Sequence, residues 1–282
     1  MYSMRSSRTI REVYEAKAAI EGAGVHLHRG FGYPELPKFD PFLLFDDFSS
    51  ENPADYLPGF PRHPHRGIET VTYILGGEVR HRDSTGTSGS ITKGDVQWMT
   101  AGSGIMHEEM PQGERGLKGF QLWVNLPKKD KMMNPRYQEV KSKEIPEVSY
   151  GKNSVVRVIA GNLRDINAPI DDIMAEPIYL DIDVKETEEI DLPILQSHNA
   201  FLYVFEGEIN VSGKRVKEGH VALLNRDGGD LNVKVGSSGA RFLLAAGKPL
   251  GEPIAWYGPI VMNSRDELEL AVSDLQTGNF VK

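Results

Sequence analysis

The sequence predicts an all-β protein in which one strand-rich unit occurs twice, and three observations point to this fold class. Short alternating or β-branched runs recur, residues 68–83 (IETVTYILGGEVRHRD) being the clearest, and such runs are typical of half-buried strands. The 282 residues include 29 glycines and 17 prolines, which favours many turns. A pattern in the first half of the chain also returns in the second half.

In the first half the expected strands follow one another closely. Gly76-Gly77 predicts a tight turn inside residues 68–83. Two further strands are expected in residues 90–102 (SITKGDVQWMTAG) and 118–126 (KGFQLWVNL), separated by a glycine-rich bend. Regular spacing of short strands predicts a β-barrel or a β-sandwich.

The second half repeats this pattern. Residues 202–209 (LYVFEGEI) parallel residues 72–79 (TYILGGEV), and residues 217–221 (KEGHV) parallel residues 92–96 (TKGDV). The offset of about 125 to 130 residues indicates a duplicated domain rather than a short-period repeat.

A charged segment with several prolines, residues 126–148, joins the two copies as a connector would. We place the boundary near Pro135, which gives an N-terminal domain of residues 1–134 and a C-terminal domain of residues 135–282.

Two stretches have the spacing of apolar residues that is typical of helices. Residues 12–20 are expected to form one helix, and residues 264–275 a short C-terminal helix. The second begins with Ser264 three residues before Glu267, which is the pattern of a capping box.

Composition excludes several classes of function. With 40 acidic and 32 basic residues, the net charge of −8 argues against direct binding of nucleic acid. The absence of cysteine excludes disulfides, thiolate metal sites and cysteine nucleophiles, so any metal must be held by carboxylates and the 8 histidines. No apolar stretch is long enough for export or for a membrane span, so we expect a soluble cytoplasmic protein.

The pattern that points most clearly to chemistry joins His63-Pro64-His65 with His107-Glu108-Glu109. In a strand, residues i and i+2 point to the same face, so His63 pairs with His65 and His107 with Glu109. If the two strands are neighbours, three imidazoles and one carboxylate converge. Such a set suits a divalent Fe, Zn, Ni, Cu or Mn ion and leaves coordination positions open.

The remaining histidines are expected to have other roles. His26-Leu27-His28 is interpreted as an alternating strand with both imidazoles on a polar face. His198 and His220 stand alone in the second half and are expected to be structural or at the surface.

Most other prominent residues are interpreted as packing or surface. Trp98, Phe120, Leu122 and Trp123 are expected in the core or the barrel wall, with some of them lining a pocket. The charge run of residues 128–131 (KKDK) is expected on a solvated face.

The histidine pattern resembles the cupin motifs. The run from His63 through His65 and Glu69 to Gly76 matches the first motif, and the run from Gly94 to His107 resembles the second. Three departures are visible: Leu57 stands where the motif has glycine, Thr100 replaces the usual proline, and His107 lies two residues late.

These departures point to one subfamily of the cupins, the pirins, which the sequence resembles. The resemblance covers nearly the whole chain and rests on five stretches: DPFLLFDDF (40–48), HPHRGIETVTYILGGEVRHRDS (63–84), GDVQWMTAGSGIMHEEMP (94–111), FQLWVNLP (120–127) and GEPIAWYGPIVMN (251–263). It implies two consecutive cupin barrels, the N-terminal one with the metal and the C-terminal one degenerate.

The resemblance also bears on the ligands and the metal. A general cupin would use Glu69 as the carboxylate ligand, whereas the pirin resemblance and the strand spacing both favour Glu109, with Glu69 left to orient an imidazole from outside the ligand set. The implied site is therefore His63, His65, His107 and Glu109 around one divalent ion, with Fe(II) preferred and Zn, Ni, Cu or Mn as alternatives.

Three functions remain open from the sequence. The resemblance implies a dioxygenase that opens a quercetin-like flavonol ring with O₂, with Glu109 as a base for the substrate hydroxyl. The alternative is a non-enzymatic regulator that responds to the metal and its oxidation state and acts through a protein partner. The third is a metal-binding domain without catalysis.

Overall fold

The computed structural model describes residues 7–281, and contacts divide them into two units. The histidine unit comprises residues 17–34, 42–142 and 250–281, and the second unit comprises residues 7–16, 35–41 and 143–249. Each unit therefore combines segments that lie far apart in the sequence. The division into domains of residues 1–134 and 135–282 stays a prediction.

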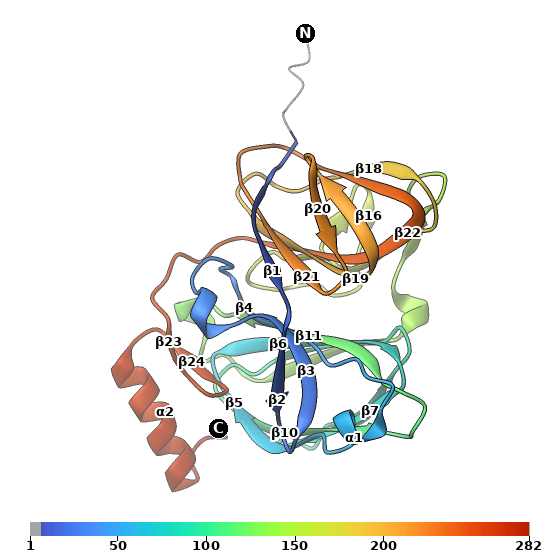
Figure 1. Cartoon of the computed structure of the whole chain (residues 1–282). Helices are drawn as coiled ribbons and strands as arrows, with labels where there is room; N and C mark the ends of the chain where they lie inside the picture. The colour runs from blue at the N-terminus through green and yellow to red at the C-terminus, as the bar shows by residue number, and fades with distance from the viewer. Residues whose placement is uncertain (1–6, 282) are drawn as a thin grey trace. The chain divides into compact units, whose positions relative to one another are not determined.

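The histidine unit is built from two antiparallel sheets (Figure 1). The larger has the order β12 (Arg136–Val140), β9 (Val96–Thr100), β6 (Ile68–Gly76), β11 (Lys118–Asn125), β4 (Phe42–Asp47), β3 (Val25–Phe31) and β2 (Lys17–Glu21). The smaller has the order β5 (Phe60–His65), β10 (Ile105–Gln112), β7 (Glu78–Asp83) and β8 (Ser88–Thr92). A separate hairpin, β23 (Ala255–Tyr257) with β24 (Ile260–Met262), and the short helices α1 (Pro53–Tyr56) and α2 (Arg265–Thr277) complete it.

The second unit has one large antiparallel sheet. Its order is β1 (Ile10–Glu15), β21 (His220–Leu224), β19 (Asn199–Val211), β22 (Leu231–Gly247), β17 (Ile178–Val184), β14 (Ser154–Ala160) and β13 (Glu147–Ser149). In addition, β18 (Glu188–Leu192) pairs with β22, β20 (Lys214–Lys217) pairs with β19, and β15 (Asn162–Leu163) pairs with β16 (Ile166–Asn167).

Short 3₁₀ turns occur at Tyr33–Glu35, Lys128–Asp130 and Ser142–Glu144. The prediction of an all-β chain with a short C-terminal helix is confirmed.

The repeat is visible in the backbone. Gly77 and Gly207, which align between the copies, have φ angles of 86° and 75°, and the aligned pair Gly94 and Gly219 has 83° and 74°. Left-handed backbone at these turns favours glycine, because a side chain there is strained. The same residue type is thus required at the same two turns in each copy.

The helix expected over residues 12–20 is wrong. This stretch forms β1, which pairs with β21 in the second unit, and β2, which pairs with β3 in the histidine unit. Glutamate, lysine and alanine give it helical propensity, but propensity contributes only tenths of a kcal/mol per residue. Two sheet edges that need a partner outweigh that preference.

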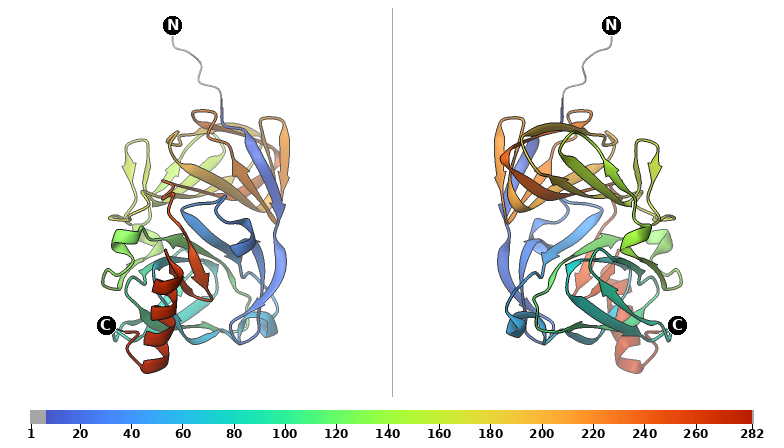
Figure 2. Two further views of the ribbon diagram at one scale, coloured as in Figure 1. Left: turned by 90° about the vertical axis from the view of Figure 1, so that its left-hand side faces the viewer. Right: turned by 90° about the vertical axis from the view of Figure 1, so that its right-hand side faces the viewer.

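The helix expected over residues 264–275 is confirmed as α2, which lies beside β23 and β24 (Figure 2). The Ser264 hydroxyl accepts a hydrogen bond from the backbone N–H of Glu267, and the Glu267 carboxylate accepts one from the backbone N–H of Ser264. Within residues 7–281, no helix is both long and apolar enough to cross a membrane.

We predict that Ser264→Ala lowers the free energy of unfolding by about 1 kcal/mol, because loss of the hydroxyl group leaves one N–H of the first turn without its acceptor. Urea unfolding measures this change. The matched control is Ser273→Ala on the exposed face of α2, which should change stability by less than about 0.5 kcal/mol. Equal effects of the two substitutions would contradict the capping role.

The expectation of a solvated face over residues 128–131 is wrong for Lys131. Lys128 and Lys129 are exposed, but Lys131 is 1% exposed. Its ammonium group donates to the carbonyl of Gly67 (2.8 Å), the side-chain oxygen of Asn125 (2.7 Å) and the carbonyl of Val261 (3.0 Å). Lys131 therefore ties the C-terminal hairpin to the strands of the histidine unit.

Burial lowers the pKa of Lys131 from 10.5 to about 7. Between these two values the native protein holds fewer protons on Lys131 than the unfolded chain, so this group makes the free energy of unfolding rise with pH. Lys131→Met should lower stability near neutral pH and flatten that rise, as measured by urea unfolding across this window. Lys129→Met, at an exposed neighbour, should leave the slope unchanged; a slope unaffected by Lys131→Met would contradict the assignment.

Candidate metal centre

Strands β5 and β10 bring the two predicted combs together. They pair in antiparallel register, with His63 opposite His107 and His65 opposite Ile105. The ring centroids of His107 lie 4.4 Å from His63 and 4.9 Å from His65. Each of the three histidines contributes one ring nitrogen, and these three nitrogens lie within 4.8 Å of one another.

The electrostatic state of these rings suits a metal. His65 and His107 are 2% and 1% exposed, and burial lowers the pKa of His65 well below 6.5 and that of His107 to about 4. Both rings are therefore neutral near neutral pH and keep a lone pair. Among the residues that the structure describes, neither nitrogen of His107 has a hydrogen-bond partner, while Nε2 of His63 lies 3.0 Å from Nε2 of His65. Neutral, convergent imidazole nitrogens fit a first-row divalent ion.

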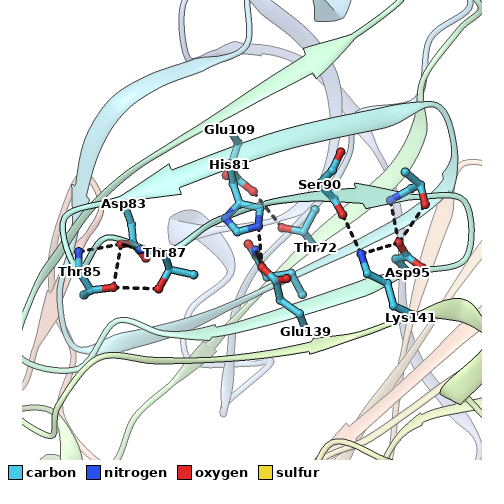
Figure 3. Close-up of polar contacts among 12 residues, drawn as sticks. Thr72, His81, Asp83, Thr85, Thr87, Ser90, Asp95, Glu109, Glu139 and Lys141 are labelled. Atoms are coloured by element: carbon cyan, nitrogen blue, oxygen red, sulfur yellow. Dashed lines mark hydrogen bonds and ion pairs between the residues drawn. The ribbon is translucent and has the colours of Figure 1, made fainter.

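Glu109 lies beside this group but not within it. Its Oε2 is 4.0 Å from Nε2 of His107, and its carboxylate accepts hydrogen bonds from the Thr72 hydroxyl (3.0 Å) and the Gln121 amide (3.2 Å). Figure 3 shows the Thr72 hydroxyl directed at this carboxylate. Thr72 and Gln121 belong to the larger sheet, so both sheets of the unit fix the position of Glu109.

Sequence reasoning missed a second polar pair next to Glu109. His81 stands opposite Glu109 in the pairing of β7 with β10 and is 3% exposed. Its Nε2 lies 2.6 Å from Oε1 of Glu139 (Figure 3), a hydrogen bond that lowers the pKa of Glu139. The ring of His81 also stacks on that of Tyr137. The signal was present as His81-Arg82-Asp83, the same spacing of two that singled out the other histidines.

Glu69 lies outside the group formed by the three histidines. It is buried and accepts a hydrogen bond from the Thr100 hydroxyl at 2.7 Å. Side chains alternate along β6, so Glu69 and Thr72, three residues apart, lie on opposite faces. A role for Glu69 in orienting an imidazole stays a prediction.

A cavity of about 630 Å³ opens beside the histidines, and His63, His65 and Glu109 form part of its wall. Its aromatic lining includes Trp123 and Trp256, whose ring centroids are 5.9 Å apart. Trp123 also contacts His65 edge to face at 5.1 Å. Trp256 comes from the C-terminal hairpin, so residues nearly 200 positions from His65 complete the cavity.

The same cavity has one strongly charged wall. The Arg29 guanidinium donates to both oxygens of Asp46 (2.8 and 2.7 Å) and to Glu21 (2.8 Å). These two carboxylates engage a single cation, so this wall is not cationic.

The outcome for the other predicted residues is mixed. His26 and His28 are exposed on β3, as predicted. Trp98, Phe120 and Leu122 are buried, which confirms packing, and Trp123 is half-buried and lines the cavity. His198 is buried at 1% exposure, whereas His220 is only partly buried.

Comparisons with known proteins agree with this architecture. Two family models match: Pirin over residues 24–124 and the Pirin C-terminal cupin domain over residues 179–281. A Pseudomonas aeruginosa protein provisionally named a quercetin 2,3-dioxygenase is 43% identical over 283 residues, which cover 98% of this chain and 99% of that protein.

Solved structures give the same result. A quercetin 2,3-dioxygenase from Acinetobacter baumannii has a TM-score of 0.90 at 34% identity, covering 98% of this chain and 99% of that one. A bacterial pirin from Escherichia coli, solved in complex with nickel(II), shares the fold with a TM-score of 0.67 at 20% identity, covering 84% and 98%. The chain therefore belongs to the pirin family, and it contains two cupin-type domains.

Proposed function

We propose that the histidine unit binds one divalent metal ion through His63, His65, His107 and Glu109, and that the loaded protein opens the ring of a flavonol-like substrate with O₂. The observation that carries this proposal is the cavity in which His63, His65 and Glu109 face an aromatic wall. Fe(II) is the preferred ion. Zn, Ni, Cu or Mn are alternatives, because a set of imidazole and carboxylate ligands accepts all of them.

A bound redox-active ion would supply Lewis acidity and one-electron exchange with O₂. The residues of the chain do the rest. Trp123 and Trp256 offer ring faces and edges against which a flat aromatic substrate can pack. The apolar walls exclude water from the reacting atoms.

In this proposal, the Glu109 carboxylate accepts the proton of the substrate's hydroxyl group. Its carboxylate lies on the cavity wall, and Thr72 and Gln121 hold it from the opposite sheet. A carboxylate fixed by two donors is already oriented before the substrate arrives, which is what a general base requires.

The test is turnover of quercetin by the iron-loaded protein in air, followed as loss of flavonol absorbance. Glu109→Gln keeps the size of the side chain and removes the carboxylate that is proposed as both ligand and base, so we expect the rate to fall at least about a hundredfold. Glu108→Gln is the matched control, because Glu108 points to the other face of β10 and pairs with Arg82.

Unchanged flavonol absorbance with the iron-loaded wild-type protein would sink the dioxygenase proposal. If metal is bound without turnover, the regulator that acts through a protein partner becomes the better hypothesis. Pull-downs with the Fe(II) and Fe(III) forms then decide it, since a redox-responsive regulator must capture different partners in the two states.

A further inference from the structure

The cavity beside the metal centre has a charged wall that the proposed function does not use. Arg29, Asp46 and Glu21 form it, and all three line the cavity. Asp46 is buried, whereas the side chains of Arg29 and Glu21 are 28% and 43% exposed. In a largely apolar cavity, a few polar groups orient the ligand and provide specificity. This wall therefore bears on which molecules the cavity accepts.

The strand register places the charged wall on the sheet face that also holds Glu109. Gln121 on β11 pairs with Asp46 on β4, and Asp46 pairs with Arg29 on β3. Directly paired residues point to the same face of a sheet, and the backbones of Gln121 and Arg29 are two strand spacings, or about 10 Å, apart. The Gln121 amide donates to the Glu109 carboxylate. Polar groups thus stand at both ends of one span, with the metal centre at one end.

Aromatic side chains extend from the metal centre along the same cavity. The ring centroid of Trp123 lies 5.1 Å from that of His65 and 5.9 Å from that of Trp256. Tyr33 continues the series, edge to face with Trp256 at 5.8 Å, and is 66% exposed. All three aromatic residues beyond His65 line the cavity. An elongated molecule with more than one aromatic ring can pack along such a series, from the buried histidines to the exposed Tyr33.

The charged wall retains hydrogen-bonding capacity. A guanidinium has five N–H donors, and within residues 7–281 Arg29 uses three of them, two toward Asp46 and one toward Glu21. Only Oε1 of Glu21 takes part in this contact. Oε2 of Glu21 can therefore accept a hydrogen bond, and Arg29 can donate another, without loss of either ion pair.

The charges of this wall favour an uncharged polar group as its ligand. Two carboxylates surround one guanidinium, so an anion gains little from Arg29. A cation would compete with Arg29 for the same carboxylates. A hydroxyl group both donates and accepts, which matches a carboxylate oxygen beside an N–H donor. Hydrogen bonds to ionised groups are also stronger than those between neutral groups.

We propose that Glu21 and Arg29 select substrates with a hydroxyl group on a ring remote from the reacting hydroxyl, so that the substrate is a polyhydroxylated flavonol. Oε2 of Glu21 accepts a hydrogen bond from this remote hydroxyl, and the Arg29 guanidinium donates one to its oxygen. Asp46 holds the guanidinium in place through both of its oxygens. This inference rests on the proposed function, because that function sets the reacting hydroxyl at the metal centre.

The test is ligand binding without turnover. The Fe(II)-loaded protein is titrated under argon, and quenching of tryptophan fluorescence reports binding, because Trp123 and Trp256 line the cavity. The two ligands are quercetin and 3-hydroxyflavone, which share the reacting hydroxyl and the ring system, whereas only quercetin has remote hydroxyl groups. We expect the wild-type protein to bind quercetin at least about tenfold more tightly, since the remote hydroxyl contacts ionised groups.

Three variants locate the source of this preference. Glu21→Leu removes the acceptor and should lower the ratio of the two affinities at least about fivefold, while its affinity for 3-hydroxyflavone shows that the cavity is intact. Glu21→Gln keeps an acceptor oxygen and should retain most of the preference. Glu114→Leu is the matched control, because Glu114 is an exposed glutamate of the same unit outside the cavity, and it should behave as the wild type.

The outcomes separate this inference from the proposed function. Equal affinities of the wild type for the two ligands, or a preference for quercetin that persists in Glu21→Leu, would overturn the role of the charged wall and leave ring opening in air untouched. A preference that depends on Glu21 would support that role even if flavonol absorbance stays unchanged in air. Binding of neither flavonol would overturn both.

Discussion

Replacing His107 with alanine is expected to remove metal binding from this chain. The His107 ring lies within 5 Å of the His63 and His65 rings, is buried, and is neutral because burial lowers its pKa to about 4. Loss of a group that merely orients a ligand costs 10–100-fold in affinity, so loss of a ligand itself should cost at least about a hundredfold. Metal content after anaerobic loading with Fe(II), and calorimetry with Ni(II), measure the change.

The matched control is His26→Ala. His26 also belongs to a His-x-His pair in the histidine unit, but its side chain is exposed on β3. It should leave metal content unchanged, with circular dichroism confirming that both variants are folded. Wild-type metal content in His107→Ala would refute the assignment of the three histidines as the ligand set.

The second large effect is expected at Arg66, the residue after His65. Its guanidinium is 1% exposed, donates to the Asp274 carboxylate (2.8 Å) and the Phe280 carbonyl (2.9 Å), and lies 4.3 Å from the centroid of the Phe280 ring. Arg66→Ala removes all three contacts and leaves a largely buried carboxylate without its cation. We expect the free energy of unfolding to fall by about 3 kcal/mol, measured by urea unfolding.

A double-mutant cycle isolates the ion pair. Because Asp274→Ala removes the charge that Arg66→Ala would strand, the double variant Arg66→Ala/Asp274→Ala should be more stable than the sum of the single effects predicts. Strictly additive effects would mean that the pair contributes nothing. Metal affinity should also fall in Arg66→Ala, since Arg66 directly follows His65, the last residue of β5.

The clearest successes of sequence reasoning were features with a local period. The spacing of two in His63-x-His65 requires only that the chain be extended, and strand β5, paired with β10, supplies that. The capping box at Ser264 and the turn glycines are local in the same sense. Such features depend on a few neighbouring residues, so a single sequence contains the information.

The failures depended on partners far away in the chain. Residues 12–20 have helical propensity, but the edges offered by β21 and β3 decided their conformation. Lys131 was expected in solvent because lysine usually is, yet a buried amide oxygen and two carbonyls hold it. No local pattern indicated that Trp256 would line the cavity beside His65, because residues 250–281 join the histidine unit only through contacts distant in the sequence.

The interleaving of the two units has a consequence for biosynthesis. The ribosome releases the chain from its N-terminus, so the strands that carry His63, His65 and His107 emerge well before residues 250–281. Domains fold as units during synthesis only when all their segments are available. Arg66 meets Asp274 and Phe280, and the cavity gains Trp256, only with the last few dozen residues. Most of the histidine unit is thus translated before residues 143–249 of the second unit, yet it is completed only after them.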